Sequence, residues 1–533
     1  MSRLEIASPK RAKIVMEGLY KDLERRIESS PPGLCPVDMA RAFLELCHAQ
    51  TCGKCVRCRI GLGQLNNFIR EVLDGKATMK TLDIMEQTAL SIMESADCAI
   101  GYEAANMVYK GLIGYRDDYI EHIQNGRCTC TYNQPVPCVS LCPAHVDIPG
   151  YIALVGEGRY ADAIRLLRKD NPFPTTCGFI CEHPCEARCR RNMVDDSINI
   201  RGLKRVAADF AGEVDPPQCA PSTGKKIAIL GGGPGGLSAA YYLQLMGHQT
   251  TVYEMLPELG GMLRYGIPNY RLPKERLDDD IRAILKTGVQ VKNGLKIGQD
   301  ITIQELRQQY DVVLITIGAS TDKKLGLENE DADGIISAVQ FLRNVGKNQI
   351  IDLTGKEVAV IGGGNVSMDA VRTAKRLGAK KVSIVYRRRV ADMTALPGEI
   401  EGAVAEGIEL QTLKAPASID VDENHHVKGI YVTPQMVSSI RDGRASIKST
   451  GEEDIYIPCD VLIVAIGQNI ETHHFEQAGI PVERGKIITK STGAFENLPG
   501  VFAGGDCASG PASVIKAIAA AKVVAANIGE YLG

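Results

Sequence analysis

Apolar positions recur every three or four residues in the first part of the chain, which is the spacing of an amphipathic helix. Two stripes have this spacing, formed by Leu65, Phe68, Ile69, Val72 and Leu73 and by Leu82, Met85, Ala89 and Ile92. We expect each stripe to be the buried face of a helix and part of an ordinary core. The pattern therefore predicts an α-helical domain over residues 1–120.

A second helical region, rich in cysteine, is predicted over residues 121–215. It ends in the helix-like sequence INIRGLKRVAADFAG. The prolines of the following VDPPQCAPSTG break any regular element, so we expect this segment to be a linker between domains.

From Lys225 the pattern changes to short strands rich in β-branched residues, each followed by a glycine turn and a helix. This alternation is typical of a parallel sheet covered by helices. KKIAIL opens one such unit, KEVAVI opens another, and the strand-like VLIVAIG follows later. The sequence therefore predicts two Rossmann-like α/β domains, one over 225–350 and 460–533 and the other, inserted into it, over 351–459.

Composition and charge narrow the class of protein. The 533 residues suffice for about three or four domains. A net charge of −3 without blocks of like charge argues against nucleic acid as a partner and against attraction to a membrane surface. The start MSRLEIASPKRAK lacks the apolar stretch of a secretory signal, and no run of about 18 apolar residues could span a bilayer, so we expect a cytoplasmic protein without membrane insertion.

The first glycine motif predicts a dinucleotide site. Gly231, Gly233 and Gly236 follow the strand KKIAIL at the fingerprint spacing, and an apolar helix comes next. Such a turn brings backbone N–H groups close to a pyrophosphate at a helix N-terminus. Glu254 ends the next strand, where a carboxylate can accept hydrogen bonds from ribose hydroxyls. An ordinary tight turn is the alternative, but strand, helix and carboxylate together favour the nucleotide.

The second motif has different chemistry. Gly362 and Gly364 fit the fingerprint, but Ser367 stands at the third glycine position. The next strand, VSIVY, ends in three arginines, of which Arg387 and Arg388 are the candidates to bind a ribose 2′-phosphate. The sequence therefore predicts a preference for NADPH over NADH at this site. The alternative is a basic strand end that simply faces water.

A third glycine turn lies near the C-terminus. Gly505 and Asp506 follow the strand VFAG and precede another apolar helix. We expect Asp506 to contact the ribityl or phosphate region of a flavin at the first site. Cys507 has no second cysteine two or three residues away, so a dithiol that takes electrons from the flavin is not indicated.

Seventeen cysteines are poor disulfide material in a reducing cytosol and favour metal ligation or redox chemistry. Cys52, Cys55 and Cys58 lie three residues apart, and Cys98 follows at a distance. A close run of three thiolates with a distant fourth is typical of a four-iron cluster. Zinc is the alternative, although structural zinc usually takes its ligands as two separated pairs.

Eight more cysteines suffice for two further clusters, and they are Cys128, Cys130, Cys138, Cys142, Cys177, Cys181, Cys185 and Cys189. The alternative is that they are small buried hydrophobes. The remaining cysteines are interpreted as structural, and they are Cys35, Cys47, Cys219, Cys459 and Cys507. His48 and His183 lie near cysteines but are given no role, because a solvated histidine is the more common case.

Residues 126–533 resemble the NADPH-oxidising small subunit of bacterial glutamate synthase and its relatives. Those relatives include the NADPH-binding subunit of electron-bifurcating transhydrogenases and the N-terminal half of dihydropyrimidine dehydrogenase. The resemblance lies in NPFP, CEHPCEARC, GGGPGGLSAAYYL, LGGMLRYGIPNYRLPK and GGGNVSMDA. Residues 43–112 resemble the C-terminal iron–sulfur domain of the NADH-binding flavoprotein subunit of respiratory complex I, through CGKCVRCR and the distant Cys98.

The resemblance implies FAD at the first motif, NADPH at the second and about three [4Fe-4S] clusters. It implies one ligand set of Cys128, Cys130, Cys138 and Cys189, and another of Cys142, Cys181 and Cys185. Cys177 is the fourth ligand that we favour for the second set, because Lys204 stands where relatives have glutamate or glutamine and an ammonium has no lone pair. The predicted cofactor-binding residues also include Pro234, Gly261, Gly318 and Asn365.

These features predict a subunit that passes electrons between NADP(H), FAD and iron–sulfur clusters. The complex-I-like domain lacks an NADH and FMN module, so it is expected to dock against a partner that retains one. The leading hypothesis is the NADP(H) subunit of a multisubunit transhydrogenase, with electron bifurcation left open. Its partners would be an NADH-binding FMN flavoprotein, a small iron–sulfur subunit and ferredoxin. The alternatives are an NADPH-oxidising subunit of glutamate synthase or another reductase, and a non-catalytic iron–sulfur bridge.

Overall fold

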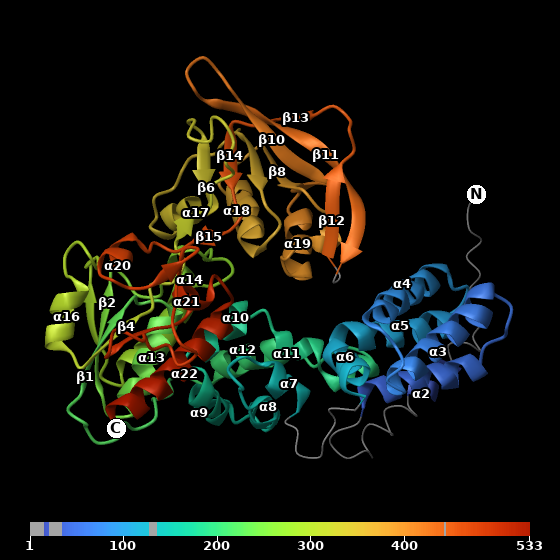
Figure 1. The fold of residues 1–533 in the computed structure, drawn as a ribbon, viewed down its shortest axis with the longest axis horizontal. Coiled ribbons are helices and arrows are strands. Elements are labelled where there is room, and N and C mark those ends of the chain that lie inside the picture. The colour runs from blue at the N-terminus through green and yellow to red at the C-terminus, as the bar shows by residue number, and fades with distance from the viewer. Residues whose placement is uncertain (1–14, 17, 21–34, 127–135, 442–443) are drawn as a thin grey trace. The chain divides into compact units, whose positions relative to one another are not determined.

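The computed structural model describes residues 15–16, 18–20, 35–126, 136–441 and 444–533 (Figure 1). Its internal contacts divide the chain into two compact units. The first unit comprises residues 1–148 and 183–200, and the second comprises 149–182 and 201–533. Cys128 and Cys130 lie outside the described residues.

The first unit is helical, as its apolar spacing predicts. Its main helices are α2 (Pro36–Ala49), α3 (Leu62–Leu73), α4 (Met79–Ser95), α5 (Ala99–Gly114) and α6 (Arg116–Asn125). Shorter elements are the π-turn η1 (Arg57–Gly61), α7 (Pro137–Leu141), α11 (Pro184–Ala187) and the 3₁₀ turn η2 (Arg190–Met193). Leu65 and Ile69 of α3 and Leu82 and Met85 of α4 are fully buried in one core. The two predicted stripes are therefore the buried faces of α3 and α4.

The second unit begins with four helices that precede its sheets. They are α8 (Ile148–Gly156), α9 (Tyr160–Asp170), α10 (Pro174–Ile180) and α12 (Ile200–Phe210). Residues 212–225 then form neither helix nor strand, as the prolines there predict. Contacts nevertheless group residues 149–182 and 201–212 with the nucleotide-binding domains, whereas the predicted domain 121–215 placed them with residues 121–148. One reason is the packing of α10 against α15, described below.

The first sheet is parallel, in the order β18-β4-β1-β2-β3. Its strands are β1 (Lys226–Leu230), β2 (Gln249–Glu254), β3 (Gln290–Asn293), β4 (Val312–Ile315) and β18 (Val501–Ala503). Associated helices are α13 (Pro234–Leu245), α14 (Met262–Tyr265), α15 (Lys274–Leu285), α16 (Ile303–Gln309), α21 (Asp506–Ser509) and α22 (Val514–Leu532). Because β18 comes from near the end of the chain and pairs with β4, the residues between them form an insertion (Figure 1).

The inserted domain has a second parallel sheet, in the order β6-β14-β7-β8-β9. Its strands are β6 (Ile335–Ser337), β7 (Glu357–Ile361), β8 (Lys381–Tyr386), β9 (Glu409–Thr412) and β14 (Val461–Val464). The predicted limits 351–459 leave β6 and β14 outside this domain, although both strands pair within its sheet. The apolar pattern of VLIVAIG marks a buried strand but carries no information on which of two sheets it joins.

Helices and antiparallel strands complete the inserted domain. The helices are α17 (Ala338–Gly346), α18 (Asn365–Arg376) and α19 (Pro397–Ala405), with a 3₁₀ turn η3 (Val390–Asp392). The antiparallel strands are β10 (Lys414–Val421), β11 (Val427–Arg441), β12 (Arg444–Ser449) and β13 (Ile455–Pro458). Short pairs outside the two main sheets are β5 (Thr321–Asp322) with β15 (Gln468–Asn469) and β16 (Val482–Glu483) with β17 (Lys486–Ile487). The helix α20 (His473–Gln477) and β17 contribute Phe475 and Ile487 to the core of the first sheet. Among the described helices, none is both long and apolar enough to cross a bilayer.

Candidate functional site

The first glycine turn is shaped by close backbone contacts. Gly231 follows β1 with a φ of +112°, and a Cβ added there would lie 2.5 Å from the carbonyl oxygen of Thr316. A Cβ on Gly236 would lie only 1.9 Å from the oxygen of Gly231, so a larger residue would push α13 away from the turn. Gly233 caps the N-terminus of α13 and Pro234 occupies its first turn. The predicted strand, turn and helix are therefore present in the geometry that suits a pyrophosphate.

Glu254 lies at the end of β2 beside this turn. Its side chain is buried, and its two carboxylate oxygens accept hydrogen bonds from the N–H groups of Gly232 at 2.7 Å and Leu256 at 2.8 Å. Burial raises the pKa of Glu254, against the lowering effect of these hydrogen bonds. Each carboxylate oxygen keeps a second lone pair, so Glu254 can still accept from a ribose hydroxyl.

Asp506 provides a separate indication of a ligand at the first turn. Its Oδ1 atom is buried and has no hydrogen-bond partner among the described residues. Burial raises the pKa of Asp506 to about 6. The preceding Gly505 has a φ of +72°, and its Cα lies 4.0 Å from where a Cβ on Gly235 would be. A buried acceptor without a donor is costly, and a hydroxyl of a bound dinucleotide would satisfy it.

Two further predicted residues belong to loops with left-handed glycines. Gly261 has a φ of +51°, and a Cβ there would lie 2.8 Å from the Cα of Gly233. Gly318 has a φ of +67°, and a Cβ there would meet no atom within 4 Å. Gly261 is thus packed against the first turn, and Gly318 borders open space. The residues at the first motif fit an FAD molecule.

The second glycine turn repeats this design with two differences. Gly362 has a φ of +148° and would clash with the oxygen of Ala465 if it carried a Cβ, and Gly364 caps α18. Ser367 replaces the third glycine, and its buried Oγ has no partner among the described residues. The side chain of Asn365 accepts from the N–H of Leu396 at 3.0 Å, so it fastens α18 to the start of α19. The turn fits a second dinucleotide.

The three arginines after β8 differ in what they contact. Arg388 donates from Nε to the oxygen of Ala445 at 3.1 Å, and Arg389 forms an ion pair with Asp392 at 2.8 Å. Arg387 is exposed and makes no hydrogen bond or ion pair with the part of the chain that is described. Arg387 is therefore the arginine best placed to meet a 2′-phosphate, while Arg388 is already occupied by the backbone.

Replacing Arg387 with methionine should reduce the preference for NADPH. A charge-assisted hydrogen bond contributes about 1.5–3 kcal/mol, so kcat/KM for NADPH should fall roughly ten- to a hundredfold while that for NADH changes little. Steady-state kinetics with both nucleotides measure the ratio. Arg389→Met is the matched control, because Arg389 is paired with Asp392. If the ratio of kcat/KM for NADPH to kcat/KM for NADH is unchanged in the Arg387 variant, this arginine does not bind the 2′-phosphate.

Four predicted cluster ligands meet in the first unit. Cys58 lies in η1, Cys98 caps the start of α5, and Cys52 is exposed. The pKa of the Cys58 thiol is raised to about 12 by burial and by the neighbouring thiols of Cys55, Cys98 and Cys52. A Cβ on Gly101 would lie 2.4 Å from the Cys58 sulfur, so only glycine leaves this space free.

This convergence fits thiolate ligation, because a bound cation favours the deprotonated form that crowding and burial disfavour. The described residues contain no group of three or more Cys, His, Asp or Glu side chains arranged to hold a single metal ion. The cysteines that the structure describes are all free thiols. The four thiols of the first unit therefore stay candidates for a cluster and form no disulfide.

The other predicted ligands fall in both units. In the first unit, burial and the nearby thiols of Cys189 and Cys142 raise the pKa of Cys138, and Cys185 is buried as well. This places Cys138 near Cys189, which the resemblance assigns to one cluster. Cys177 and Cys181 are buried in the second unit. The set of Cys142, Cys181 and Cys185 takes residues from both units and stays a prediction.

Cys177 lies in α10, within the second unit. Its thiol is fully buried, and burial followed by the charge of Cys181 raises its pKa, while the nearby ammonium of Lys204 lowers it. Lys204 is itself 6% exposed, with its Nζ 5.9 Å from the ring centre of Tyr151. Cys177 and Cys181 are thus neighbours at one end of α10, as a shared cluster requires.

A buried carboxylate joins this helix to the first nucleotide-binding domain, and the sequence gives no local sign of it. Asp280 of α15 is fully buried and accepts hydrogen bonds from the first-turn N–H groups of Thr175 at 3.2 Å and Thr176 at 2.7 Å. These donors have no partner within their own helix. Asp280 therefore fastens the cysteine-bearing helix α10 to α15, which also packs against α13.

Replacing Asp280 with alanine should loosen α10. Two buried N–H groups would lose their acceptor, at a cost of about 2–4 kcal/mol. Amide hydrogen exchange over residues 174–181 should accelerate, and the thermal midpoint should fall. Asp279→Ala is the matched control, because Asp279 is half-exposed in its ion pairs and its loss should cost about 1 kcal/mol or less. Unchanged exchange in the Asp280 variant would contradict this role.

The same residue predicts a pH dependence. Burial raises the pKa of Asp280 to about 6, although hydrogen bonds from α10 lower it. The folded state therefore favours the protonated form of Asp280. The resulting contribution to the free energy of unfolding is complete below about pH 4 and is lost as the pH rises through about 6. The neutral variant Asp280→Asn should show a smaller fall in thermal midpoint between about pH 5 and about pH 7 than the wild type. Equal falls would exclude Asp280 as the titrating group.

A second network joins the two nucleotide-binding domains. Arg271, in the loop between α14 and α15, binds Asp369 of α18 at 2.8 Å and Glu399 of α19 at 3.1 Å. The neighbouring Tyr270 ring lies 3.8 Å from the guanidinium of Arg376. Burial raises the pKa of Asp369 to about 6, against the charge of Arg271. The segment GIPNYRLPK thus holds the inserted domain, a role that sequence reasoning missed.

Family models match almost the whole described chain. Residues 225–521 match the pyridine nucleotide-disulphide oxidoreductase family. Residues 38–122 match the iron–sulfur binding region of NADH-ubiquinone oxidoreductase F, and residues 114–215 match dihydropyrimidine dehydrogenase domain II with its 4Fe-4S cluster. The predicted order of two iron–sulfur domains and then an FAD and NADP domain is confirmed.

Similar proteins are oxidoreductase subunits. The beta subunit of NADP(+)-dependent formate dehydrogenase from Moorella thermoacetica is 32% identical, covering 92% of this chain and 79% of that protein. The beta subunit of NADPH-Fe(3+) oxidoreductase from Geobacter sulfurreducens is 34% identical, covering 94% and 79%. The small chain of glutamate synthase [NADPH] from Escherichia coli strain K12 is 34% identical, covering 74% and 88%.

Solved structures agree on the fold. FprA from Mycobacterium tuberculosis superposes with a TM-score of 0.50 and 21% identity, covering 58% of this chain and 85% of that chain. The glycine turns, the inserted second sheet and the family matches point to the same conclusion. The chain belongs to the pyridine nucleotide-disulphide oxidoreductase family, and it is an oxidoreductase in which two 4Fe-4S domains precede an FAD and NADP(H) domain pair.

Proposed function

We propose that this chain is the NADP(H) subunit of a multisubunit transhydrogenase in the cytoplasm. It exchanges electrons among NADPH, NADH and a ferredoxin-type carrier. The observation that carries the proposal is the complex-I-like domain, which brings three thiols together around that of Cys58, ahead of a complete pair of nucleotide turns. A bound flavin takes up a hydride and gives up electrons singly, which is what a nucleotide site connected to iron–sulfur clusters needs.

The residues of the second unit bind and orient the two dinucleotides. The turn at Gly231 and the N-terminus of α13 hold the pyrophosphate of the first, and Glu254 accepts from its ribose. Asp506 accepts from a hydroxyl of the same molecule. Arg387 binds the 2′-phosphate of the second dinucleotide, and the contact of Arg271 with Asp369 keeps the domains that bear the two sites together.

The thiol site of the first unit supplies a surface for the partner. Cys52 is exposed beside Val56 and Ile60, which are 55% and 52% exposed. Lys54 and Arg57 are exposed in the same segment and form no ion pair with other described residues. Apolar side chains among unpaired cations suit an acidic protein surface, because complementary charge speeds encounter and orients the partner. The proposed occupant is an NADH-binding FMN and iron–sulfur subunit.

The experiment is isolation of the native complex under anaerobic conditions. The chain should copurify with an FMN-containing NADH-binding subunit, and the complex should reduce NAD⁺ with NADPH. The double variant Val56→Asp, Ile60→Glu should lose the partner yet keep NADPH-dependent flavin reduction. Ile84→Glu, at an apolar residue of α4 that is 40% exposed, is the control. A solitary monomer with full activity would overturn the proposal.

The alternative hypothesis, that the chain is a small subunit of glutamate synthase, has less support. The glutamate synthase small chain matches 74% of this chain, and the family match of residues 38–122 is to a different protein class. An isolated complex with a glutamine-dependent large subunit and no NADH-binding subunit would favour that reading.

A further inference from the structure

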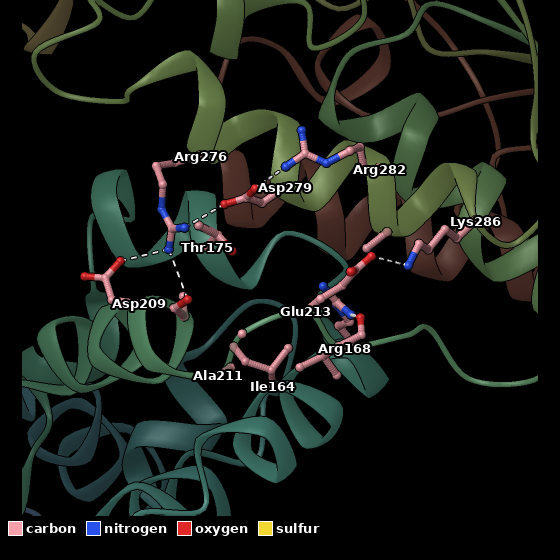
Figure 2. Close-up of a pocket in the computed structure, with 14 residues that line it drawn as sticks. Ile164, Arg168, Thr175, Asp209, Ala211, Glu213, Arg276, Asp279, Arg282 and Lys286 are labelled. Atoms are coloured by element: carbon pink, nitrogen blue, oxygen red, sulfur yellow. Dashed lines mark hydrogen bonds and ion pairs between the residues drawn. The ribbon is translucent and has the colours of Figure 1, made fainter.

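A cavity of about 340 Å³ lies within the second unit, between α15 on one side and α9, α12 and the segment after α12 on the other (Figure 2). Four cationic side chains line it, and they are Arg168, Arg276, Arg282 and Lys286. Three carboxylates also line it, and they are Asp209, Asp279 and Glu213. The lining therefore has one positive charge more than it has negative charges.

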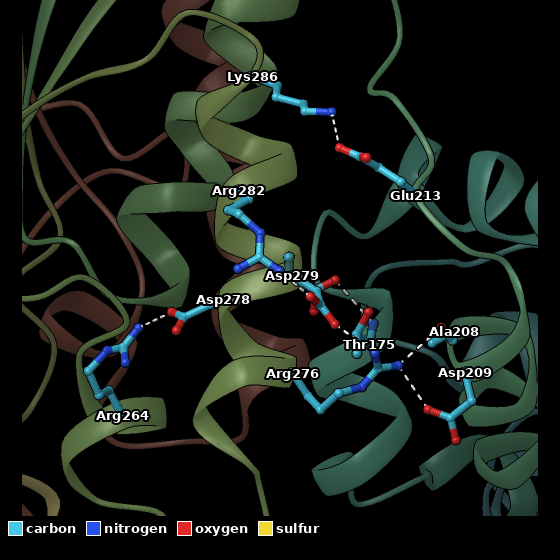
Figure 3. A network of polar contacts seen from close by, with 11 residues as sticks. Thr175, Ala208, Asp209, Glu213, Arg264, Arg276, Asp278, Asp279, Arg282 and Lys286 are labelled. Carbon is cyan, nitrogen blue, oxygen red and sulfur yellow. Dashed lines mark hydrogen bonds and ion pairs between the residues drawn. The ribbon is translucent and has the colours of Figure 1, made fainter.

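Most of these charges already have partners (Figure 3). Arg276 donates to Asp209 at 2.8 Å and to Asp279 at 2.7 Å, and Arg282 pairs with Asp279. Lys286 pairs with Glu213 and, at 2.9 Å, with Asp215, which does not line the cavity. The side chains of Arg282 and Lys286 are 65% and 42% exposed, so their ion pairs contribute little and can give way to a ligand.

Arg168 is the exception. The residue is 6% exposed, and its Nη1 donates to the carbonyl oxygen of Val214. Its Nε is buried without a partner, and no carboxylate of the described residues forms an ion pair with its guanidinium, although the charges of Asp280 and Asp215 act on it. Burial lowers the pKa of Arg168. A buried cation that no carboxylate contacts directly is costly, and an anion in the cavity would supply that contact.

We propose that this cavity binds a small polyvalent anion bearing phosphate or carboxylate groups, with Arg168 as its principal partner. A guanidinium binds either group through two parallel hydrogen bonds. The volume lies at the lower end of the range for small-molecule sites, about 300–1,000 Å³. Ile164 and Ala211 offer apolar contact for a short carbon skeleton.

Because of where the cavity lies, binding of an anion there should affect the stability of the second unit. Thr175, which donates its N–H to Asp280, also lines the cavity. The anion would therefore tie the cysteine-bearing helix α10 and its neighbours to α15, and its binding should stabilise the second unit by mass action. The inference does not depend on which partner the chain serves.

The test is isothermal titration of the full chain with inorganic phosphate, pyrophosphate and citrate at constant ionic strength. Saturable binding of at least one probe, with a Kd below about 1 mM, is expected. Arg168→Met should weaken it at least tenfold. Arg165→Met, at an exposed residue of α9 outside the cavity, should not change it. Arg387→Met distinguishes the cavity from the nucleotide site. If the anion binds in the cavity, this substitution should leave its affinity unchanged.

The three probes distinguish the chemical class of the ligand. Binding of phosphate and pyrophosphate alone assigns a phosphate-bearing ligand, and binding of citrate alone assigns a carboxylate. Absence of saturable binding for every probe, or equal affinity in wild type and Arg168→Met, would overturn the proposal. If circular dichroism shows that Arg168→Met is misfolded, the surface double variant Arg282→Met, Lys286→Met replaces it, and unchanged affinity in that variant would overturn the proposal.

Discussion

Replacing Gly236 with alanine should yield a protein that purifies with little flavin. The new Cβ would lie 1.9 Å from the carbonyl oxygen of Gly231 and 2.8 Å from Oγ1 of Thr316. Backbone atoms at the end of β1 cannot move without distorting the sheet. Overpacking costs about 1–3 kcal/mol and sometimes more, so FAD affinity should fall by about a hundredfold or more. Flavin absorbance per chain after gel filtration measures the loss.

Gly398→Ala is the matched control for this variant. Gly398 lies in the first turn of α19, has no left-handed φ, and a Cβ there would meet no atom within 4 Å. Flavin content should stay at the wild-type level, and helix stability should rise slightly, because alanine is the better helix former. Full flavin content in Gly236→Ala would show that the turn does not hold the cofactor in the way described.

Replacing Cys55 with alanine should remove one iron–sulfur cluster and leave the nucleotide sites intact. The four thiols around Cys58 belong to the first unit, whereas both glycine turns belong to the second. A [4Fe-4S] cluster needs four ligands, so iron content should fall by about four atoms per chain. NADPH should still reduce the flavin in stopped-flow measurements, while transfer to an external one-electron acceptor should decline.

Cys219→Ala serves as the control for the thiol substitution. Cys219 is half-buried, and its thiol donates to the carbonyl oxygen of Thr287 at 3.5 Å. Loss of this weak hydrogen bond should leave iron and acid-labile sulfide unchanged. Equal iron content in Cys55→Ala and Cys219→Ala would refute the cluster at Cys52, Cys55, Cys58 and Cys98.

Local sequence patterns were sufficient to predict those parts of the site whose residues lie close together in the chain. The Gly231 turn needs a strand, three glycines and a helix in direct succession, and each of these has a recognisable sequence signal. Glu254 follows from the same unit, because the end of the next parallel strand must lie beside the turn. Cys98 was a candidate fourth ligand to the run of Cys52, Cys55 and Cys58 from the typical pattern of four-iron clusters, and the resemblance to complex I supported it.

Contacts between distant segments were not predictable in this way. Asp280 and Thr176 are far apart in the chain, and a carboxylate in a charged run such as LDDD usually faces water. The pairing of Arg271 with Asp369 is similar, because each residue is ordinary in its own helix or loop. Neither contact produces a periodic pattern in the sequence, so the sequence analysis predicted neither of them.

By itself, the amino-acid sequence determined the helical iron–sulfur domains, the two nucleotide turns and the class of chemistry, because these depend on short-range spacing of glycine, cysteine and apolar residues. Only the tertiary structure decided which sheet receives β6 and β14, which arginine stays unpaired after β8, and how α10 is anchored to α15. It also revealed the buried Arg168, whose Nε has no hydrogen-bond partner among the described residues. These features depend on which surfaces meet when the chain folds, and burial and pairing across such surfaces are properties of the packed molecule.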